Sequence, residues 1–293
     1  MQDYIIRATA GNGSVRIFAS NTKSLVGRAQ QLHKTTPVAT AALGRTLTAA
    51  AMMGATLKND TDILTLDIRG SGPLGGIVTV TDNKSRVKGY VFNPHIEMMK
   101  NAKGKLDVGG AVGIGVLTVT QDMGIKEPVS GQVELISSEI AEDITYYFAV
   151  SEQTPSSVAL GVLVDVDYSV KQAGGYIIQL MPFAEESMIK HLENVLPTLP
   201  PMTTLLEEGK TVEDVLEMIF ADHGLTILET TYPQFYCNCS REKTKKALVS
   251  VGQDELHAIL EEDGGANLHC NFCNADYFFD EKDIELLLKL PEA

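Results

Sequence analysis

The chain has 293 residues, of which 44% are hydrophobic, so it can bury a sizeable core and has room for two domains or one large domain with an appendage. Its net charge is −14, and this excess belongs entirely to residues 181–293, which contain 22 Asp and Glu but only 8 Lys and Arg. Residues 1–180 contain 16 of each sign. A domain boundary near residue 180 is therefore expected, and nucleic acid is a poor partner for the acidic C-terminal part.

The N-terminus has no basic segment followed by an apolar stretch, which a secretory signal would require. No apolar run approaches the roughly 18 residues of a membrane span. We therefore expect a cytoplasmic protein without a membrane partner. In that compartment thiols are kept reduced and permanent disulfides are rare.

Residues 1–180 are predicted to form an α+β domain with mainly antiparallel sheet. Residues 4–19 alternate apolar and polar side chains around a Gly-Asn-Gly-Ser turn, which predicts a hairpin. Residues 36–57 predict a helix with Pro37 in its first turn, apolar nearly all round and hence buried against a sheet. A second helical stretch is expected at 138–151. Further strands are expected at residues 63–69, 76–81, 86–92, 116–120, 131–137, 157–165 and 176–180. Long strand-only runs leave little room for repeated βαβ units.

None of the glycine-rich segments predicts a nucleotide site. Residues 70–76 and 109–115 do not lie between a strand and a helix with dinucleotide-binding spacing. Gly209-Lys-Thr resembles the end of a phosphate-binding loop, but position 204, where that loop needs a glycine, is Thr. No catalytic triad order or paired-carboxylate signature stands out either. We therefore expect no enzyme, with these glycines serving turns and close backbone packing.

Residues 181–232 predict short amphipathic helices interrupted by prolines. One helix is expected at 184–196, and Thr211 is a plausible N-cap of the next, with Asp214 at its third position. The two apolar stripes comprise Met188, Ile189, Leu192, Val195 and Leu196, and then Val212, Val215, Leu216, Ile219 and Phe220. Because isolated helices shorter than about 12–15 residues are marginal in water, these helices need a neighbour to dock on. The segment is either an ordinary helical subdomain or a linker that stays folded only while its neighbour is folded.

All four cysteines lie near the C-terminus, as Cys237-x-Cys239 and Cys270-x-x-Cys273. Two close pairs at this separation can place four thiolates around one tetrahedral ion, and Zn²⁺ is the usual occupant of such sites. We predict one Zn²⁺ per chain in the reduced state, with His269 outside the ligand set. The single residue inside the first pair fits the usual zinc-knuckle turn poorly and indicates a site that can be lost as well as made. Structural disulfides and four unrelated buried cysteines are the alternatives.

Zinc binding can account for the folding of the C-terminal region. A structural zinc site contributes on the order of 10–16 kcal/mol, and a region of this size is barely stabilised by its core alone. If the thiols were oxidised within each pair, the tiny loops so closed would return little folding energy, and zinc would leave. The basic residues Arg241, Lys243, Lys245 and Lys246 beside the first pair would favour thiolate, unless they form only a solvated face.

The cysteine pattern resembles that of the redox-regulated thirty-three-kilodalton heat-shock chaperones (the chaperonins of that size). The likeness extends to Arg-Gly-Ser-Gly-Pro-Leu-Gly at 69–75, Ser-Gly-Gln-Val-Glu-Leu at 130–135 with Ala-Glu-Asp at 141–143, and Ala-Gly-Gly-Tyr-Ile-Ile-Gln-Leu-Met-Pro at 173–182. It covers essentially the whole chain, and the four cysteine positions match the family pattern without departure.

This resemblance implies an ATP-independent holdase that is inactive while reduced and zinc-loaded. Oxidation aided by heat would form the disulfides Cys237–Cys239 and Cys270–Cys273, expel zinc, and unfold the zinc domain and the linker. The exposed apolar surface would bind unfolding client proteins. The family also implies a homodimer on activation and later transfer of clients to ATP-dependent foldase systems.

The predicted division is a core domain at 1–180, a helical linker at 181–232 and a zinc-binding redox-switch domain at 233–293. Client-binding candidates are the sheet face under the linker and seven linker residues. These residues are Met188, Ile189, Leu192, Val215, Leu216, Ile219 and Phe220.

Two other functions compete with the holdase. A thiol oxidoreductase could use Cys270-Asn-Phe-Cys273, but such a motif normally opens a helix after a strand in a thioredoxin-like unit, which this sequence does not predict. A zinc module could bind a partner protein constitutively, whereas the acidic charge disfavours nucleic acid.

Overall fold

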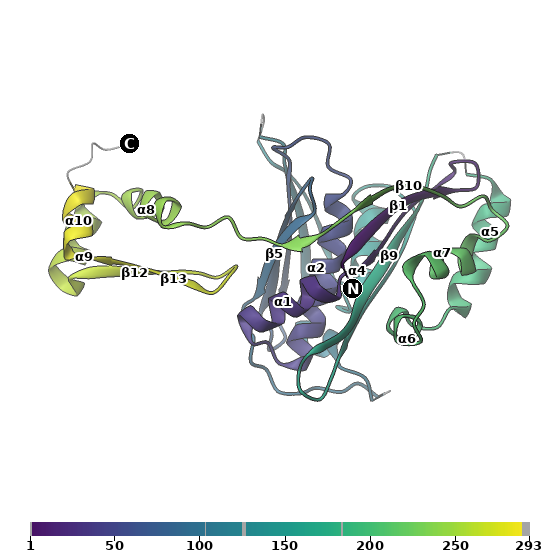
Figure 1. Ribbon diagram of the computed structural model, residues 1–293, viewed down its shortest axis with the longest axis horizontal. Coiled ribbons are helices and arrows are strands. Elements are labelled where there is room, and N and C mark those ends of the chain that lie inside the picture. Colours follow the sequence, from purple (N-terminus) through teal and green to yellow (C-terminus); the bar gives the residue numbers. More distant parts are fainter. Residues whose placement is uncertain (1, 103, 125–126, 183, 289–293) are drawn as a thin grey trace. The chain divides into compact units, whose positions relative to one another are not determined.

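The computed structural model describes residues 2–102, 104–124, 127–182 and 184–288. The chain forms two compact units, Met1–Tyr236 and Cys237–Ala293, which are described separately (Figure 1). Residues 183 and 289–293 of the predicted linker and C-terminal domain lie outside the described residues. No helix in the described part of the chain is long and apolar enough to cross a membrane.

The first unit contains a five-stranded antiparallel sheet in the order β10-β1-β2-β9-β8. Its strands are β1 (Tyr4–Ala10), β2 (Val15–Asn21), β8 (Ser156–Val164), β9 (Val170–Leu180) and β10 (Thr226–Thr231). β1 and β2 form the predicted hairpin, and Gly11, Asn12 and Gly13 adopt positive φ in its turn.

A six-stranded sheet lies on the other side of this unit's core, in the order β11-β5-β4-β3-β6-β7. Its strands are β3 (Ile63–Gly70), β4 (Gly76–Asp82), β5 (Arg86–Val91), β6 (Gly115–Asp122), β7 (Val129–Glu134) and β11 (Gln234–Phe235). All its pairings are antiparallel except β11 with β5. The α+β class with mainly antiparallel sheet is thus confirmed.

Helix α2 (Pro37–Gly54) runs between the two sheets and packs on strands of both (Figure 1). Every residue of this helix is buried except Arg45, which is half-buried. Its many Ala, Thr and Gly residues have small side chains or none, which lets strands approach on all sides. At Gly54 even a Cβ atom would not fit, because it would lie 2.5 Å from the Thr81 hydroxyl. The predicted buried helix is confirmed, with its start at Pro37. The other helices of this layer are α1 (Lys23–His33), α3 (Val108–Val112) and α4 (Ala141–Val150).

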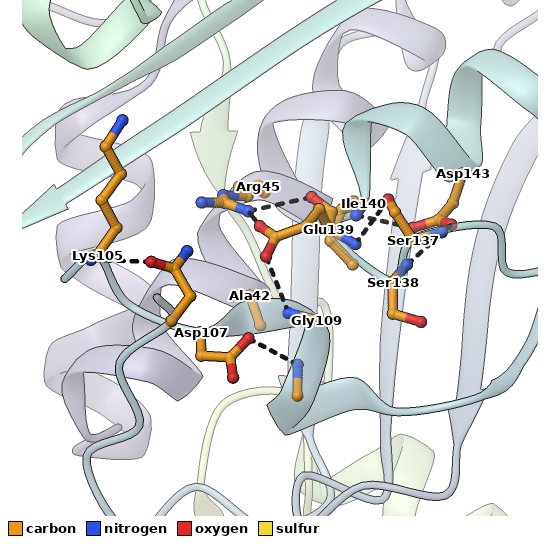
Figure 2. Close-up of polar contacts among 12 residues, drawn as sticks. Ala42, Arg45, Lys105, Asp107, Gly109, Ser137, Ser138, Glu139, Ile140 and Asp143 are labelled. Atoms are coloured by element: carbon orange, nitrogen blue, oxygen red, sulfur yellow. Dashed lines mark hydrogen bonds and ion pairs between the residues drawn. The ribbon is translucent and has the colours of Figure 1, made fainter. Parts of the chain in front are cut away.

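A polar network fixes the loop between β7 and α4 (Figure 2). Asp143 is fully buried, and its carboxylate accepts the backbone N–H groups of residues 136, 137, 138 and 140. These bonds hold Ile140 at φ 75°, a conformation that a β-branched residue avoids. The predicted helix at 138–151 therefore starts only at Ala141. Arg45 of α2 pairs with Glu139 of the same loop, whose other carboxylate oxygen accepts Gly109 N–H of α3.

A third layer covers the face of the five-stranded sheet that points away from α2 (Figure 1). It comprises α5 (Glu186–Val195), a 3₁₀ turn (Leu196–Thr198), α6 (Met202–Glu207) and α7 (Val212–Phe220). The Thr211 hydroxyl accepts Asp214 N–H and the Asp214 carboxylate accepts Thr211 N–H, which is the predicted cap.

The segment 181–232 is not helical throughout. Its last residues, Thr-Ile-Leu-Glu-Thr-Thr, form strand β10 and pair with β1. Their β-branched side chains suit an extended backbone, and the edge of β1 supplies hydrogen-bond partners that a helix would not need. Segment 181–232 therefore contributes both a helical layer and an edge strand to the first unit.

In its described residues, 237–288, the second unit contains a two-stranded hairpin and three helices. These are α8 (Arg241–Val249), α9 (Gln253–Asp263), β12 (Gly265–Cys270), β13 (Ala275–Asp280) and α10 (Glu281–Leu288). Its buried apolar core comprises Leu248, Leu256, Phe279, Ile284 and Leu287. Five such residues stabilise a unit of this size only marginally.

Candidate metal centre and apolar layer

The structure brings the four predicted metal ligands together in the second unit. Cys237 and Cys239 lie in the irregular segment before α8, Cys270 ends β12, and Cys273 lies in the turn before β13. Their four sulfur atoms all lie within 4.8 Å of one another. The Sγ atoms are 3.7 Å apart for Cys237 and Cys270, and 3.2 Å apart for Cys239 and Cys273.

The hairpin turn places the second pair. Cys270 carbonyl accepts the N–H groups of Cys273 (3.2 Å) and Asn274 (2.8 Å), and Asn274 adopts φ 61°. This tight turn directs both thiols to the same side. An asparagine tolerates the left-handed conformation that the turn requires.

Arg241 ties the first pair to the hairpin. Its guanidinium donates to the Phe278 carbonyl (2.5 Å) and to the Asp283 carboxylate (2.6 Å), and lies 4.3 Å from the centre of the Phe279 ring. Ser240 caps α8 by accepting Lys243 N–H. The segment before α8 is thus held beside β13 by contacts that do not involve sulfur.

The sulfur positions fit a four-thiolate site. Zn–S bonds of 2.3 Å in a tetrahedron place the sulfurs about 3.8 Å apart. The two closest contacts, 3.7 and 3.2 Å, lie slightly below that value, and all four sulfurs lie within 4.8 Å of one another. Four thiolates are soft ligands, which favour zinc over magnesium or calcium. All four cysteines are half-buried and none is in a disulfide.

The four thiols differ in acidity in the metal-free protein. Burial opposes ionisation of Cys239, but hydrogen bonds from Tyr277 (O–H to Sγ, 3.1 Å) and from the other thiols outweigh it and lower its pKa to about 7. Burial raises the pKa of Cys237 and, more strongly, of Cys273. Cys239 is therefore the most thiolate-like of these three.

The acidity of Cys239 does not come from the basic run. Arg241 is engaged by Asp283, and Lys243, Lys245 and Lys246 are exposed on α8. The solvated-face interpretation of these lysines fits their exposure. His269 pairs with Asp276 across the hairpin at 2.8 Å and is not among the clustered ligands.

The seven client-binding candidates all lie in the layer formed by α5 and α7. Six are buried: Met188, Leu192, Val215, Leu216, Ile219 and Phe220. Ile189 is half-buried. They pack on the outer face of the five-stranded sheet, which contributes Ile6, Ala8, Ala10, Val15, Ile17, Ala19, Tyr176 and Ile178. In this docked arrangement six of the seven cannot contact another protein.

The context that a thiol oxidoreductase needs is missing from the described residues. Cys270 and Cys273 flank the turn of an antiparallel hairpin, and Cys270 ends a strand without opening a helix. In thioredoxin-like sites the first cysteine opens a helix after a strand.

Comparison with known proteins gives a consistent result. A family model described as Hsp33 protein matches residues 3–280. The chain is 47% identical to a 33 kDa chaperonin of Acetivibrio thermocellus over 100% of this chain and 99% of that protein. It is 51% identical to a 33 kDa chaperonin of Clostridioides difficile over 99% of both. The crystal structure of a 33 kDa chaperonin from Thermotoga maritima superposes with a TM-score of 0.92 at 39% identity, covering 99% of this chain and 98% of that one.

Proposed function

The chain belongs to the Hsp33 family of chaperones, and on this premise we propose that it is a redox-regulated, ATP-independent holdase of the cytoplasm. The observation that carries the proposal is the cluster of four thiols in a unit whose described residues include five buried apolar core residues. A unit so small needs a cross-link to stay folded, and four thiolates can supply one by binding a metal ion. Oxidation of the thiols would release that ion, so the cross-link can be undone chemically.

In the resting state Cys237, Cys239, Cys270 and Cys273 would hold one Zn²⁺. Bound zinc would cross-link the segment before α8 to the β12–β13 hairpin. Two hydrogen bonds hold the same two segments together: Arg241 donates to the Phe278 carbonyl, and the Tyr277 hydroxyl donates to the Cys239 sulfur. The reduced protein would therefore be folded and inactive.

Peroxide would open the site by oxidising each pair. Two thiols lose two electrons and two protons to one peroxide, which gives one disulfide and two waters. The family resemblance implies the disulfides Cys237–Cys239 and Cys270–Cys273, and all four sulfurs lie within 4.8 Å of one another, so this pairing is within reach. This pairing leaves no bond between the two halves of the site. Each disulfide would close only a tiny loop and so would add little to the stability of the second unit. Without zinc, the unit would unfold.

Client binding would follow from loosening of the α5–α7 layer. Its helices have 10, 6 and 9 residues, which is too short for stability away from the sheet. Undocking would expose two apolar surfaces, the stripe containing Met188, Leu192 and Phe220 and the sheet face beneath it. Contiguous apolar surface of this kind binds unfolding proteins without any catalytic step.

Several finer points belong to the same proposal. The activated protein would form a homodimer and pass clients to ATP-dependent foldase systems. The acidic excess of residues 181–293 would keep a chaperone with exposed apolar surface soluble and would disfavour nucleic acid as a partner. Its action would be binding rather than catalysis.

Light scattering of a heat-unfolding client tests the proposal. Reduced, zinc-loaded protein is compared with protein treated with peroxide at elevated temperature, while a zinc-sensitive dye follows metal release. Suppression of aggregation only by the oxidised sample, together with zinc release, is expected. Equal suppression by both samples would remove the switch, and suppression by neither would remove the chaperone function.

A further inference from the structure

The inner face of the five-stranded sheet turns from apolar to cationic along its strands. On β1 the side chains toward α2 are Ile5, Arg7 and Thr9, and on β2 they are Phe18 and Arg16. Arg7 lies opposite Phe18 and Thr9 lies opposite Arg16. The apolar core thus ends at two arginines carried on neighbouring strands.

A cavity of about 360 Å³ lies at this place, between the sheet, the residues after α2 and the turn between β4 and β5. Arg7 and Arg16 line it from the sheet, Lys58 from the segment after α2, and Asn83 from the turn. A second cavity, of about 410 Å³, adjoins it through Arg16 and Thr56. These volumes fall in the range of small-molecule sites.

The cavity has more positive charge than its walls neutralise. Arg7, Arg16 and Lys58 face a single lining carboxylate, Glu229, which lies 3.2 Å from Arg7. Arg16 donates from Nε (3.1 Å) and Nη2 (2.7 Å) to the amide oxygen of Gln179, a neutral acceptor. In the described part of the chain neither Arg16 nor Lys58 forms an ion pair with a carboxylate.

Arg16 is held where a cation is unfavourable. Burial lowers the pKa of its guanidinium, and the neighbouring Arg7 lowers it further. The group nonetheless stays charged at neutral pH. A partly buried cation without a carboxylate partner is costly unless an anion approaches it.

Two polar atoms in the same walls also lack partners. The Thr231 hydroxyl and the Asn83 amide oxygen are buried, and neither has a hydrogen bond within the protein. The Asn83 amide nitrogen donates to Asp60 at 3.0 Å, which leaves its oxygen as an acceptor for a ligand hydroxyl. The Thr231 hydroxyl can donate to a ligand oxygen.

We propose that this cavity binds a small phosphate monoester that also has hydroxyl groups, with Arg7, Arg16 and Lys58 around the phosphate. Three cations against one carboxylate leave two positive charges, which match a phosphate dianion. Arg7 and Arg16 line the cavity from the sheet and Lys58 lines it from the segment after α2, so cations on two walls can contact different oxygens of one phosphate. Asn83 and Thr231 would bind the hydroxylated part. The walls of this cavity include neither a cysteine nor a client-binding candidate, so the proposal does not rest on the proposed chaperone function.

Isothermal titration calorimetry of the reduced, zinc-loaded full chain tests the site. The probes are ribose 5-phosphate, inorganic phosphate and ribose, at constant ionic strength. We expect ribose 5-phosphate to bind, inorganic phosphate to bind more weakly, and ribose not to bind. Because a charged hydrogen bond is lost, Arg16→Gln and Lys58→Gln should each weaken binding by at least about tenfold.

Arg28→Gln is the matched control, because Arg28 is exposed on α1 and lies outside this cavity. It should leave the affinity unchanged. Lys58 is exposed, so Lys58→Gln keeps the test valid even if Arg16→Gln disturbs folding, which circular dichroism would show. Three results would overturn the proposal: no binding of ribose 5-phosphate at millimolar concentration, wild-type affinity in Lys58→Gln, or equal loss in Arg28→Gln.

Discussion

Phe220→Ala should make the reduced protein an active chaperone without oxidation. Phe220 ends α7 and is fully buried between the helical layer and the five-stranded sheet. Truncating a buried phenylalanine costs about 3–5 kcal/mol of stability. Helix α7 has only nine residues, too few to stay helical once its packing on the sheet is weakened. The loss is local, because Phe220 belongs to the outer apolar cluster and not to the core around α2.

Three measurements on reduced, zinc-loaded Phe220→Ala follow from this reasoning. Zinc content should equal that of the wild type, since the cysteines lie in the other unit. Limited proteolysis should cut within residues 184–225 and leave α2 intact. Light scattering should show suppression of client aggregation. Phe92→Ala is the matched control, because Phe92 is 43% exposed at the end of β5 and its truncation should change none of these readouts.

Two outcomes would contradict this reasoning, one on the client site and one on the stability of the layer. If Phe220→Ala loses protection in α7 but does not suppress aggregation, the surface under the layer is not the client site. If the layer stays protected from protease, the estimated cost is wrong, and no conclusion about clients would follow from that variant.

Three further predictions concern the polar contacts. Asp143→Ala removes the acceptor of four backbone N–H groups and should lower the free energy of unfolding by on the order of 3–5 kcal/mol in urea titrations, whereas Asp143→Asn, which keeps one carbonyl oxygen, should cost less. Tyr277→Phe removes the hydrogen bond to Cys239 and should weaken zinc binding by roughly 10–100-fold in competition with a chromophoric chelator, while Tyr232→Phe, at an exposed tyrosine, should not. In zinc-free reduced protein under conditions where circular dichroism shows the second unit folded, alkylation of Cys239 should rise through about pH 7 as its thiolate forms, well before that of Cys273. Peptide mass spectrometry can follow both cysteines, and simultaneous labelling would contradict the assigned acidities.

Features encoded by neighbouring residues could be predicted from the sequence. The β1–β2 turn, the start of α2 at Pro37 and the Thr211–Asp214 cap each depend on residues a few positions apart. Helix α1 has no such signal. The Asp3 carboxylate, just before β1 and about twenty residues earlier, accepts its first N–H groups, from Ser24 (2.9 Å) and Leu25 (2.5 Å). A cap supplied from a distant strand is invisible to local pattern analysis.

The candidate metal centre likewise has features that the sequence predicts and features that it does not. The spacing of Cys237, Cys239, Cys270 and Cys273 indicates a metal centre, because two close pairs of thiols at this separation are typical of a four-thiolate zinc site. The spacing does not reveal that the Tyr277 hydroxyl bonds to one sulfur, since that contact depends on the register of β12 against β13. Strand β10 was missed because its pairing with β1 joins residues more than two hundred positions apart.

The distribution of buried residues explains how one protein can unfold in part and remain a chaperone. The core around α2 and both sheets has 37 buried apolar residues among those described, and none of them is a cysteine. The outer layer and its sheet face share 18, and the second unit has five. Free energy from apolar burial falls in that order, so under the proposed switch oxidation of the cysteines would unfold the least stable unit first. The outer layer is next in order, and its loss exposes apolar surface on a sheet that the inner core still holds in place. A protein with a single continuous core could not release apolar surface without losing the scaffold that presents it.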